Sequence, residues 1–249
     1  MSQTIPSNVR FVMRMERAFR NWIPILLSLF VLFNALPIIA PIAMKTGLTP
    51  VGNVIYSVYG GLLSHQYANR SFFLFGEKLM YTPDDLPFDL QDEFLPDTDA
   101  LEAFRGSTEF GWKLAWSDRL VAMYGSMLLT FIAFAKFRWK HFPLWLGVLL
   151  ALPLIIDGAT HMHSDSASVI SGYRYDNAWL ASLTGDAFSP SFYIGDALGS
   201  FNSTMRLISG ILLGIGFFGW AMPITDRYFH RNADTLAQKL DNWRNRQEK

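Results

Sequence analysis

The 249-residue chain carries 21 Lys and Arg residues and 21 Asp and Glu residues, so its formal net charge is zero. It lacks the excess of basic residues that is typical of nucleic-acid-binding proteins. Hydrophobic residues make up 51% of the sequence and charged residues only 17%, which is more apolar than a typical soluble domain. The chain has no cysteine, which excludes disulfides, thiolate nucleophiles and cysteine-ligated metal centres.

Four apolar stretches reach the roughly 20 residues that a membrane-spanning helix requires. In chain order they are residues 22–44, 117–135, 143–162 and 203–224. The first follows a basic segment and is longer than the apolar core of a cleavable signal peptide, so we expect a retained anchor. A fifth stretch, 49–66, is shorter and is interrupted by Pro and Gly residues.

The distribution of charge predicts the orientation. Lys and Arg gather before the first span, between the second and third, and after the fourth, whereas the segment 67–116 is rich in Asp and Glu. Because basic residues near the ends of spans are retained in the cytoplasm, we expect all three basic clusters, and both termini, to be cytoplasmic.

The predicted fold is therefore an all-α, multi-pass membrane helix bundle of about four transmembrane helices in the plasma or inner membrane. Segment 49–66 is then a short re-entrant or interfacial helix on the outer side. The alternative is five full spans, which would place the basic N-terminus outside.

Three regions follow from this topology. Residues 1–21 form a basic cytoplasmic N-terminus, and residues 22–225 form the transmembrane domain with outer loops 67–116 and 164–201. Residues 226–249 form a charged cytoplasmic C-terminal region, in which 232–247 has helical periodicity.

Polar and ionisable residues cluster at the predicted outer ends of the spans, where they are costly and often functional. The candidate catalytic residues are His65, Asp118, Asp157 and His161. The candidate substrate-binding residues are Gln66, Arg70, Arg119, Asn202 and Arg206, because Arg side chains bind phosphate oxygens in a bidentate manner.

Asp157 and His161 are four residues apart and share one face of a continuing helix. A carboxylate beside an imidazole can act as an acid/base pair or co-ligate a metal. With His65 they are candidate ligands of a divalent metal, although no cofactor is identified. The same polar set would also suit a purely structural network between helices.

Four short motifs resemble those of a bacterial family of predicted multi-spanning membrane proteins of unknown function. The family pattern is similar to C-H-Q-x-x-x-R-S, C-x-R-C-x-G-x-Y, D-G-x-T-Q and S-N-x-x-x-R. The matching positions lie between about residues 50 and 215 and are Ser64-His65-Gln66 with Arg70-Ser71, Ser117 to Tyr124, Asp157 to His161, and Asn202 to Arg206.

This chain departs from the family pattern at each cysteine, where it has Ser64, Ser117 and Leu120, and it has His161 in place of Gln. The resemblance implies a membrane fold and a polar site, but no reaction and no cofactor.

Two functions remain open, and the sequence does not decide whether the protein is an enzyme. The first is binding or processing of an anionic lipid or small headgroup by the His/Asp/Arg site at the outer face. The alternative is a non-catalytic structural or accessory subunit of a membrane complex. The predicted partners are membrane lipids and other membrane protein subunits.

Overall fold

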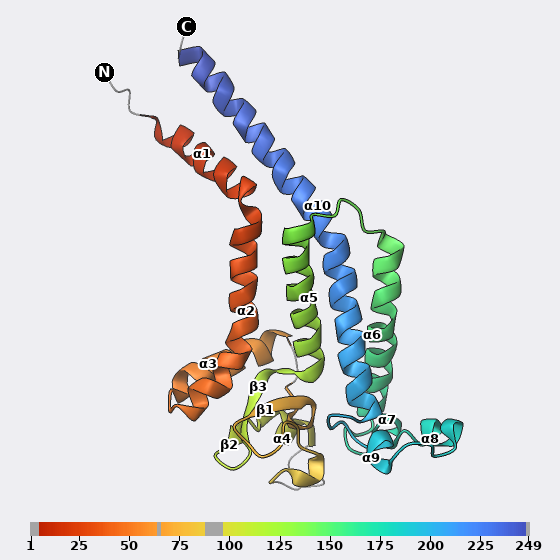
Figure 1. The fold of residues 1–249 in the computed structure, drawn as a ribbon. Helices are drawn as coiled ribbons and strands as arrows, with labels where there is room; N and C mark the ends of the chain where they lie inside the picture. The colour runs from red at the N-terminus through yellow and green to blue at the C-terminus, as the bar shows by residue number, and fades with distance from the viewer. Residues whose placement is uncertain (1–4, 64–65, 88–96, 248–249) are drawn as a thin grey trace.

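The computed structural model describes residues 5–63, 66–87 and 97–247. Within these residues, four helices are long and apolar enough to cross a membrane: α2 (Trp22–Lys45), α5 (Asp118–Phe137), α6 (Leu144–Asp165) and α10 (Phe201–Gln247). They run side by side in Figure 1. The predicted all-α membrane bundle is confirmed, and the four predicted spans correspond to these helices.

Helix α10 packs against both α5 and α6 and forms the centre of the bundle. Two glycines bring it close to α5, since a Cβ atom at Gly210 would lie 2.7 Å from the Arg119 carbonyl oxygen. A Cβ atom at Gly214 would lie 1.9 Å from the hydroxyl oxygen of Ser126. Any larger side chain at these two positions would push the helices apart.

The short apolar stretch forms α3 (Thr49–Leu63), which has 15 residues and is too short for a full span. It lies across the direction of the long helices in Figure 1, after a turn at Gly47 with a φ of 82°. The structure therefore agrees with the prediction of four spans and one short helix, and not with the alternative of five full spans.

A proline in α2 creates the docking point for α3. Pro37 has no N–H, so the carbonyl oxygen of Phe33, four residues earlier, lacks its helical donor. The hydroxyl of Tyr59 in α3 donates to this oxygen at 2.7 Å. Tyr59 also packs its ring against Trp116 in the buried aromatic cluster between α2, α3 and α5.

The same arrangement occurs in α10, which continues through Pro223 for 47 residues. The carbonyl oxygen of Gly219, freed by this proline, accepts a hydrogen bond from the indole N–H of Trp139 at 3.1 Å. The residues 232–247 predicted as a C-terminal helix are thus the last part of α10.

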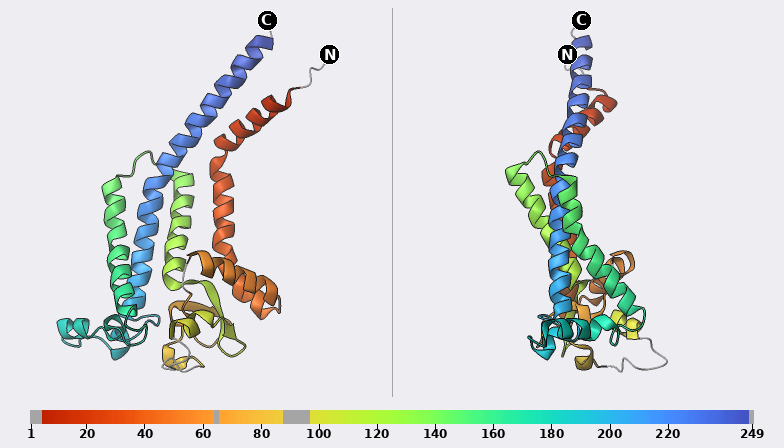
Figure 2. Two further views of the ribbon diagram at one scale, coloured as in Figure 1. Left: turned by 180° about the vertical axis from the view of Figure 1, so that it is seen from behind. Right: turned by 90° about the vertical axis from the view of Figure 1, so that its right-hand side faces the viewer.

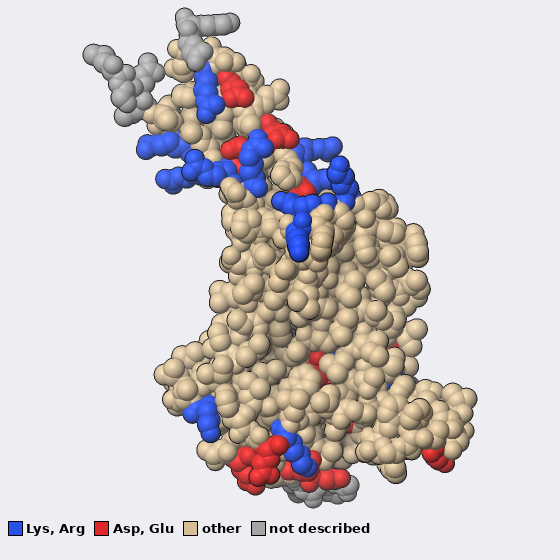
Figure 3. Space-filling model, in the orientation of Figure 1, with Lys and Arg blue, Asp and Glu red and all other residues tan. Residues whose placement is uncertain are grey.

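Both termini lie at one end of the bundle, which we call the terminal end (Figures 1 and 2). There α1 (Ser7–Arg20) packs against α10, and the rings of Trp22 and Phe229 stack at 5.2 Å. Most of the Lys and Arg side chains visible in Figure 3 lie at this end, with some Asp and Glu among them. At the opposite end, which we call the loop end, Asp and Glu lie beside a few Lys and Arg (Figure 3).

Residues 67–116, predicted as an outer loop, form the first loop of the loop end and contain a small antiparallel sheet. Its strands are β1 (Ser71–Leu74), β2 (Gly106–Ser107) and β3 (Gly111–Ser117), in the order β1-β3-β2, with Ser71 opposite Ser117. Short helices η1 (Ala68–Arg70), η2 (Pro83–Asp85) and α4 (Asp97–Ala103) complete this segment.

The second loop contains α7 (Tyr173–Asp176), α8 (Ala178–Thr184) and α9 (Pro190–Tyr193). It begins directly after α6 and ends where α10 begins. Both loops therefore close over the same ends of α5, α6 and α10 (Figure 1).

A fully buried lysine organises the first loop. The ammonium group of Lys113, in β3, donates to the backbone oxygens of Gln66 and of Glu102, the latter at 2.8 Å. Burial lowers the pKa of Lys113 to about 7. The ammonium group thus ties the start of the loop to the end of α4.

We expect Gly214→Leu to lower the free energy of unfolding by about 1–3 kcal/mol, because the side chain overlaps the backbone of α5. Thermal unfolding in detergent measures this. Gly125→Ala is the matched control, since a Cβ atom there meets no heavy atom within 4 Å and stability should not fall. An unchanged melting temperature for Gly214→Leu would contradict the close approach of α5 and α10.

The lowered pKa of Lys113 predicts that stability rises with pH. Between about pH 7 and the unfolded value near 10.4, the unfolded chain keeps a proton that the folded chain has lost. The expected slope is up to about 1.4 kcal/mol per pH unit. Thermal unfolding from pH 7 to 9 should show this slope in the natural protein, and Lys113→Met should lose it. Parallel curves for the two proteins would refute the assignment.

Candidate functional site

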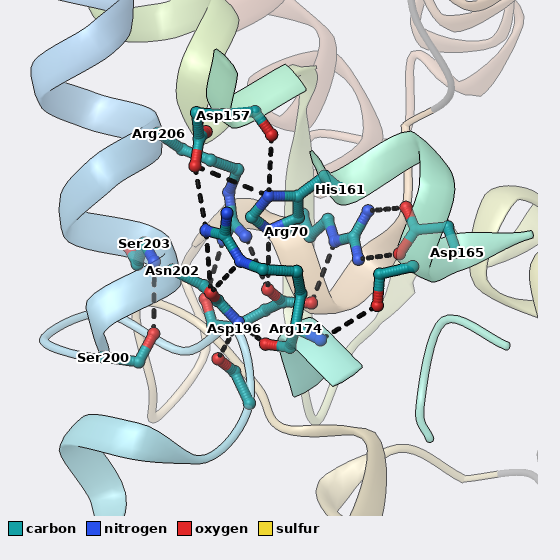
Figure 4. Close-up of polar contacts among 12 residues, drawn as sticks. Arg70, Asp157, His161, Asp165, Arg174, Asp196, Ser200, Asn202, Ser203 and Arg206 are labelled. Atoms are coloured by element: carbon teal, nitrogen blue, oxygen red, sulfur yellow. Dashed lines mark hydrogen bonds and ion pairs between the residues drawn. The ribbon is translucent and has the colours of Figure 1, made fainter. Parts of the chain in front are cut away.

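The loop ends of three spans bring charged side chains together. Asp118 and Arg119 open α5, Asp157 and His161 lie near the end of α6, and Arg206 lies near the start of α10. Figure 4 shows Asp157, His161 and Arg206 meeting residues from the two loops. The predicted clusters at the outer ends of the spans therefore meet at one level of the molecule.

Arg206 is the centre of the larger group of contacts. Its guanidinium nitrogens donate to the carboxylate of Asp118 at 2.9 and 3.0 Å, and Nη1 donates to Asp196 at 2.5 Å. All three side chains are buried, with Asp118 fully inaccessible to solvent. Arg206 thus joins the start of α5 to the second loop.

Arg70 continues this group into the first loop. Its Nε donates to Asp196 at 2.9 Å, and its two terminal nitrogens donate to both oxygens of Asp165 at 2.6 and 2.8 Å. Burial alone would lower the pKa of Arg70 and raise that of Asp196. The attraction between the opposite charges is stronger, so the pKa of Arg70 is raised and the pKa of Asp196 is held well below its usual value. Both residues are ionised throughout the physiological pH range.

Asp157 is the centre of a second group. It accepts hydrogen bonds from Arg119 at 2.6 Å and from Arg174 at 2.9 Å. Arg174, in α7, also donates to the hydroxyl of Thr160 at 2.6 Å and to the side-chain oxygen of Asn202 at 3.1 Å. Nearly all donors of Arg174 are therefore used to hold the second loop against α6 and α10.

His161 lies between the two groups (Figure 4). Its Nδ1 is 3.2 Å from the backbone oxygen of Asp157 and 3.5 Å from its carboxylate. Its Nε2 is 3.8 Å from Asp196 and has no hydrogen-bond partner, although the side chain is only 5% exposed. A buried ring nitrogen without a partner marks a place where a ligand or water can bind.

A pocket of about 630 Å³ opens at this point between α5, α6 and the first loop. Its lining includes Arg70, Arg119, Gly158, His161 and Arg206. The Nε of Arg119 is also buried without a partner. A Cβ atom at Gly158 would lie 3.4 Å from Nη1 of Arg119, so α6 passes close to this guanidinium.

The structure places the other predicted residues as follows. Gln66 donates from its side chain to the Ala115 carbonyl oxygen at 2.8 Å, and so binds the first loop to β3. Asn202 donates to the Gly195 carbonyl oxygen at 3.0 Å. His65 lies outside the described residues, and among those described no group of three His, Asp or Glu side chains is arranged to hold a metal.

Sequence reasoning missed three members of this site: Asp165, Arg174 and Asp196. All three belong to the segment from the end of α6 to the start of α10, much of it irregular, where no periodicity predicts which side chains turn inward. The available signal in the sequence was the occurrence of Arg and Asp in a loop rich in aromatic residues.

Comparisons of the chain with protein-family models, curated proteins and solved structures find no match. The resemblance to the bacterial family stays a hypothesis based on four motifs.

We expect Arg206→Leu to destabilise the protein by about 3–5 kcal/mol, because it leaves the buried carboxylates of Asp118 and Asp196 without their common partner. Thermal unfolding in detergent measures the loss. Arg244→Leu is the control, because Arg244 lies near the end of α10 and its ion pair with Asp241 is exposed to solvent. Equal stability of the two variants would show that the pairing in the site is not structural.

Proposed function

We propose that the pocket binds an anionic ligand through Arg119 and His161. The observation that carries this proposal is that both residues line the pocket and both have a buried nitrogen without a partner. An oxyanion such as phosphate or carboxylate supplies the acceptor that the Nε–H of Arg119 lacks, and a hydroxyl or protonated oxygen of the same ligand donates to Nε2 of His161.

Among the arginines of the site, Arg119 is the one that supports binding best. Arg70 and Arg206 direct all their guanidinium nitrogens at carboxylates or backbone oxygens. The side chain of Arg119 donates to Asp157 and remains 20% exposed. A ligand at Arg119 therefore displaces no internal ion pair.

The position of the pocket favours a lipid headgroup or a small anion at the membrane surface. The pocket lies at the loop ends of the spans, and the basic terminal end faces the cytoplasm under the charge rule. On this orientation the ligand approaches from the outer leaflet.

The geometry also supports proton transfer. The contact between Nδ1 of His161 and the backbone oxygen of Asp157 favours the tautomer with its proton on Nδ1. Nε2 then carries the lone pair and accepts a proton from a ligand hydroxyl. A divalent metal remains a prediction that depends on His65.

The alternative is a structural or accessory subunit, and the extensive pairing of Arg70, Arg174 and Arg206 supports it. Nearly all the guanidinium donors of these three arginines are paired within the protein, so they leave few donors for a ligand. The two functions predict different effects of replacing Arg119. If the pocket binds a ligand, the replacement weakens that binding, whereas within the protein it removes only the hydrogen bond to Asp157.

We expect Arg119→Gln to weaken binding of short-chain phosphatidylglycerol by tenfold or more, since a charge-assisted hydrogen bond contributes about 1.5–3 kcal/mol. Titration of the purified protein in detergent, with zwitterionic phosphatidylcholine as the comparison of zero net charge, measures this. Arg138→Gln is the control, because Arg138 is a partly exposed arginine at the terminal end. Equal affinity of Arg119→Gln and the natural protein, with folding intact, would reject the proposal.

A further inference from the structure

The second loop forms an arm, residues 177–194, that projects sideways from the bundle beyond α6 (Figures 1 and 2). It exposes large apolar side chains that a soluble surface would bury. Leu183 is 76% exposed, Phe188 53% and Trp179 48%. Trp179 and Leu183 are four residues apart in α8 and share one face of that helix.

The arm is a folded unit, so this exposure is built into its structure. The side-chain nitrogen of Asn177 donates to the Tyr193 carbonyl oxygen at 2.7 Å and closes the arm at its base. At its far end, the hydroxyl of Tyr193 accepts from the backbone N–H of Phe188 at 3.1 Å and pairs with the hydroxyl of Thr184. Phe188 and Phe192 pack against each other, with ring centroids 4.6 Å apart.

The charge of the arm is very low. Asp186 is the only ionisable acid or base in residues 177–192, and no Lys or Arg occurs there. Figure 3 likewise shows no basic side chain on the protruding part. A protein-binding surface is usually rimmed by polar and charged groups, whereas this arm carries one charged side chain, Asp186, and a few serine hydroxyls.

The arm lies beside the ends of α6 and α10, and this position indicates which environment its apolar side chains meet. The arm follows α7, which packs on the end of α6, and returns through α9 to the start of α10. It therefore lies at the level where two spans end, beside lipid. The bundle does not cover it, since a pocket of about 600 Å³ lined by Thr160 and Trp179 separates it from α6.

We propose that the arm is an interfacial anchor that inserts Trp179, Leu183 and Phe188 into the leaflet at the loop end. Aromatic and apolar side chains on a short helix at the headgroup level bind membranes in this way. The anchor holds α7, and with it Arg174, at a fixed depth in the membrane. The inference does not depend on whether the pocket binds an anion.

The absence of cysteine permits a direct test by site-directed spin labelling of the full chain in phosphatidylcholine vesicles. Leu183→Cys carries the label on the arm, Ile156→Cys is the lipid-facing control on α6, and Glu77→Cys is the exposed control on the first loop. Accessibility of each label to oxygen, which partitions into lipid, is compared with accessibility to a water-soluble nickel chelate.

The expected ratio of oxygen to nickel accessibility at Leu183→Cys is several-fold above that at Glu77→Cys and close to that at Ile156→Cys. A ratio equal to that at Glu77→Cys would overturn the proposal, because the arm would then lie in water.

A second variant shows that the apolar side chain itself causes insertion. Leu183→Asp should leave the melting temperature unchanged, because Leu183 is 76% exposed, while a label at Phe188→Cys moves towards water. A label at Phe188→Cys that stays at the same depth in Leu183→Asp would contradict anchoring by this face.

Discussion

The buried pairing of Arg206 with Asp118 and Asp196 is the interaction on which the loop end depends. An arginine without a partner in this environment would cost several kcal/mol, so the start of α5 and the second loop must both lie where their carboxylates reach it. The close approach of α10 to α5 at Gly210, one turn beyond Arg206, makes this geometry attainable. Small residues between the helices and charges at their ends thus act together.

The ion pairs of the site also distinguish the arginines with a structural role from Arg119, which can still bind a ligand. Arg70, Arg174 and Arg206 are largely occupied by contacts that hold loops to spans. Arg119 meets the pocket with a nitrogen unpaired, beside the unpaired nitrogen of His161. One network can therefore stabilise the fold and present a binding site, with the two roles carried by different side chains.

The sequence was sufficient for the spans, because the length and apolarity of a helix that crosses lipid are strict requirements. It also placed Asp118, Asp157, His161 and Arg206 at one level. It missed β3, because a lysine, Lys113, stands in the middle of that strand, and its burial depends on hydrogen bonds to backbone oxygens of segments distant in the sequence. Asp196 and Arg174 were missed for a related reason, since their burial depends on partners supplied by other elements.

Two prolines in the spans have a consequence for how the bundle is assembled. Each removes one backbone donor, and each orphaned oxygen is claimed by an aromatic side chain from elsewhere, Tyr59 at Phe33 and Trp139 at Gly219. Within lipid, water cannot donate a hydrogen bond to such an oxygen, so only a correctly docked segment supplies the donor. The prolines thus specify where α3 and the connection from α5 to α6 attach, at no loss of continuity in α2 or α10.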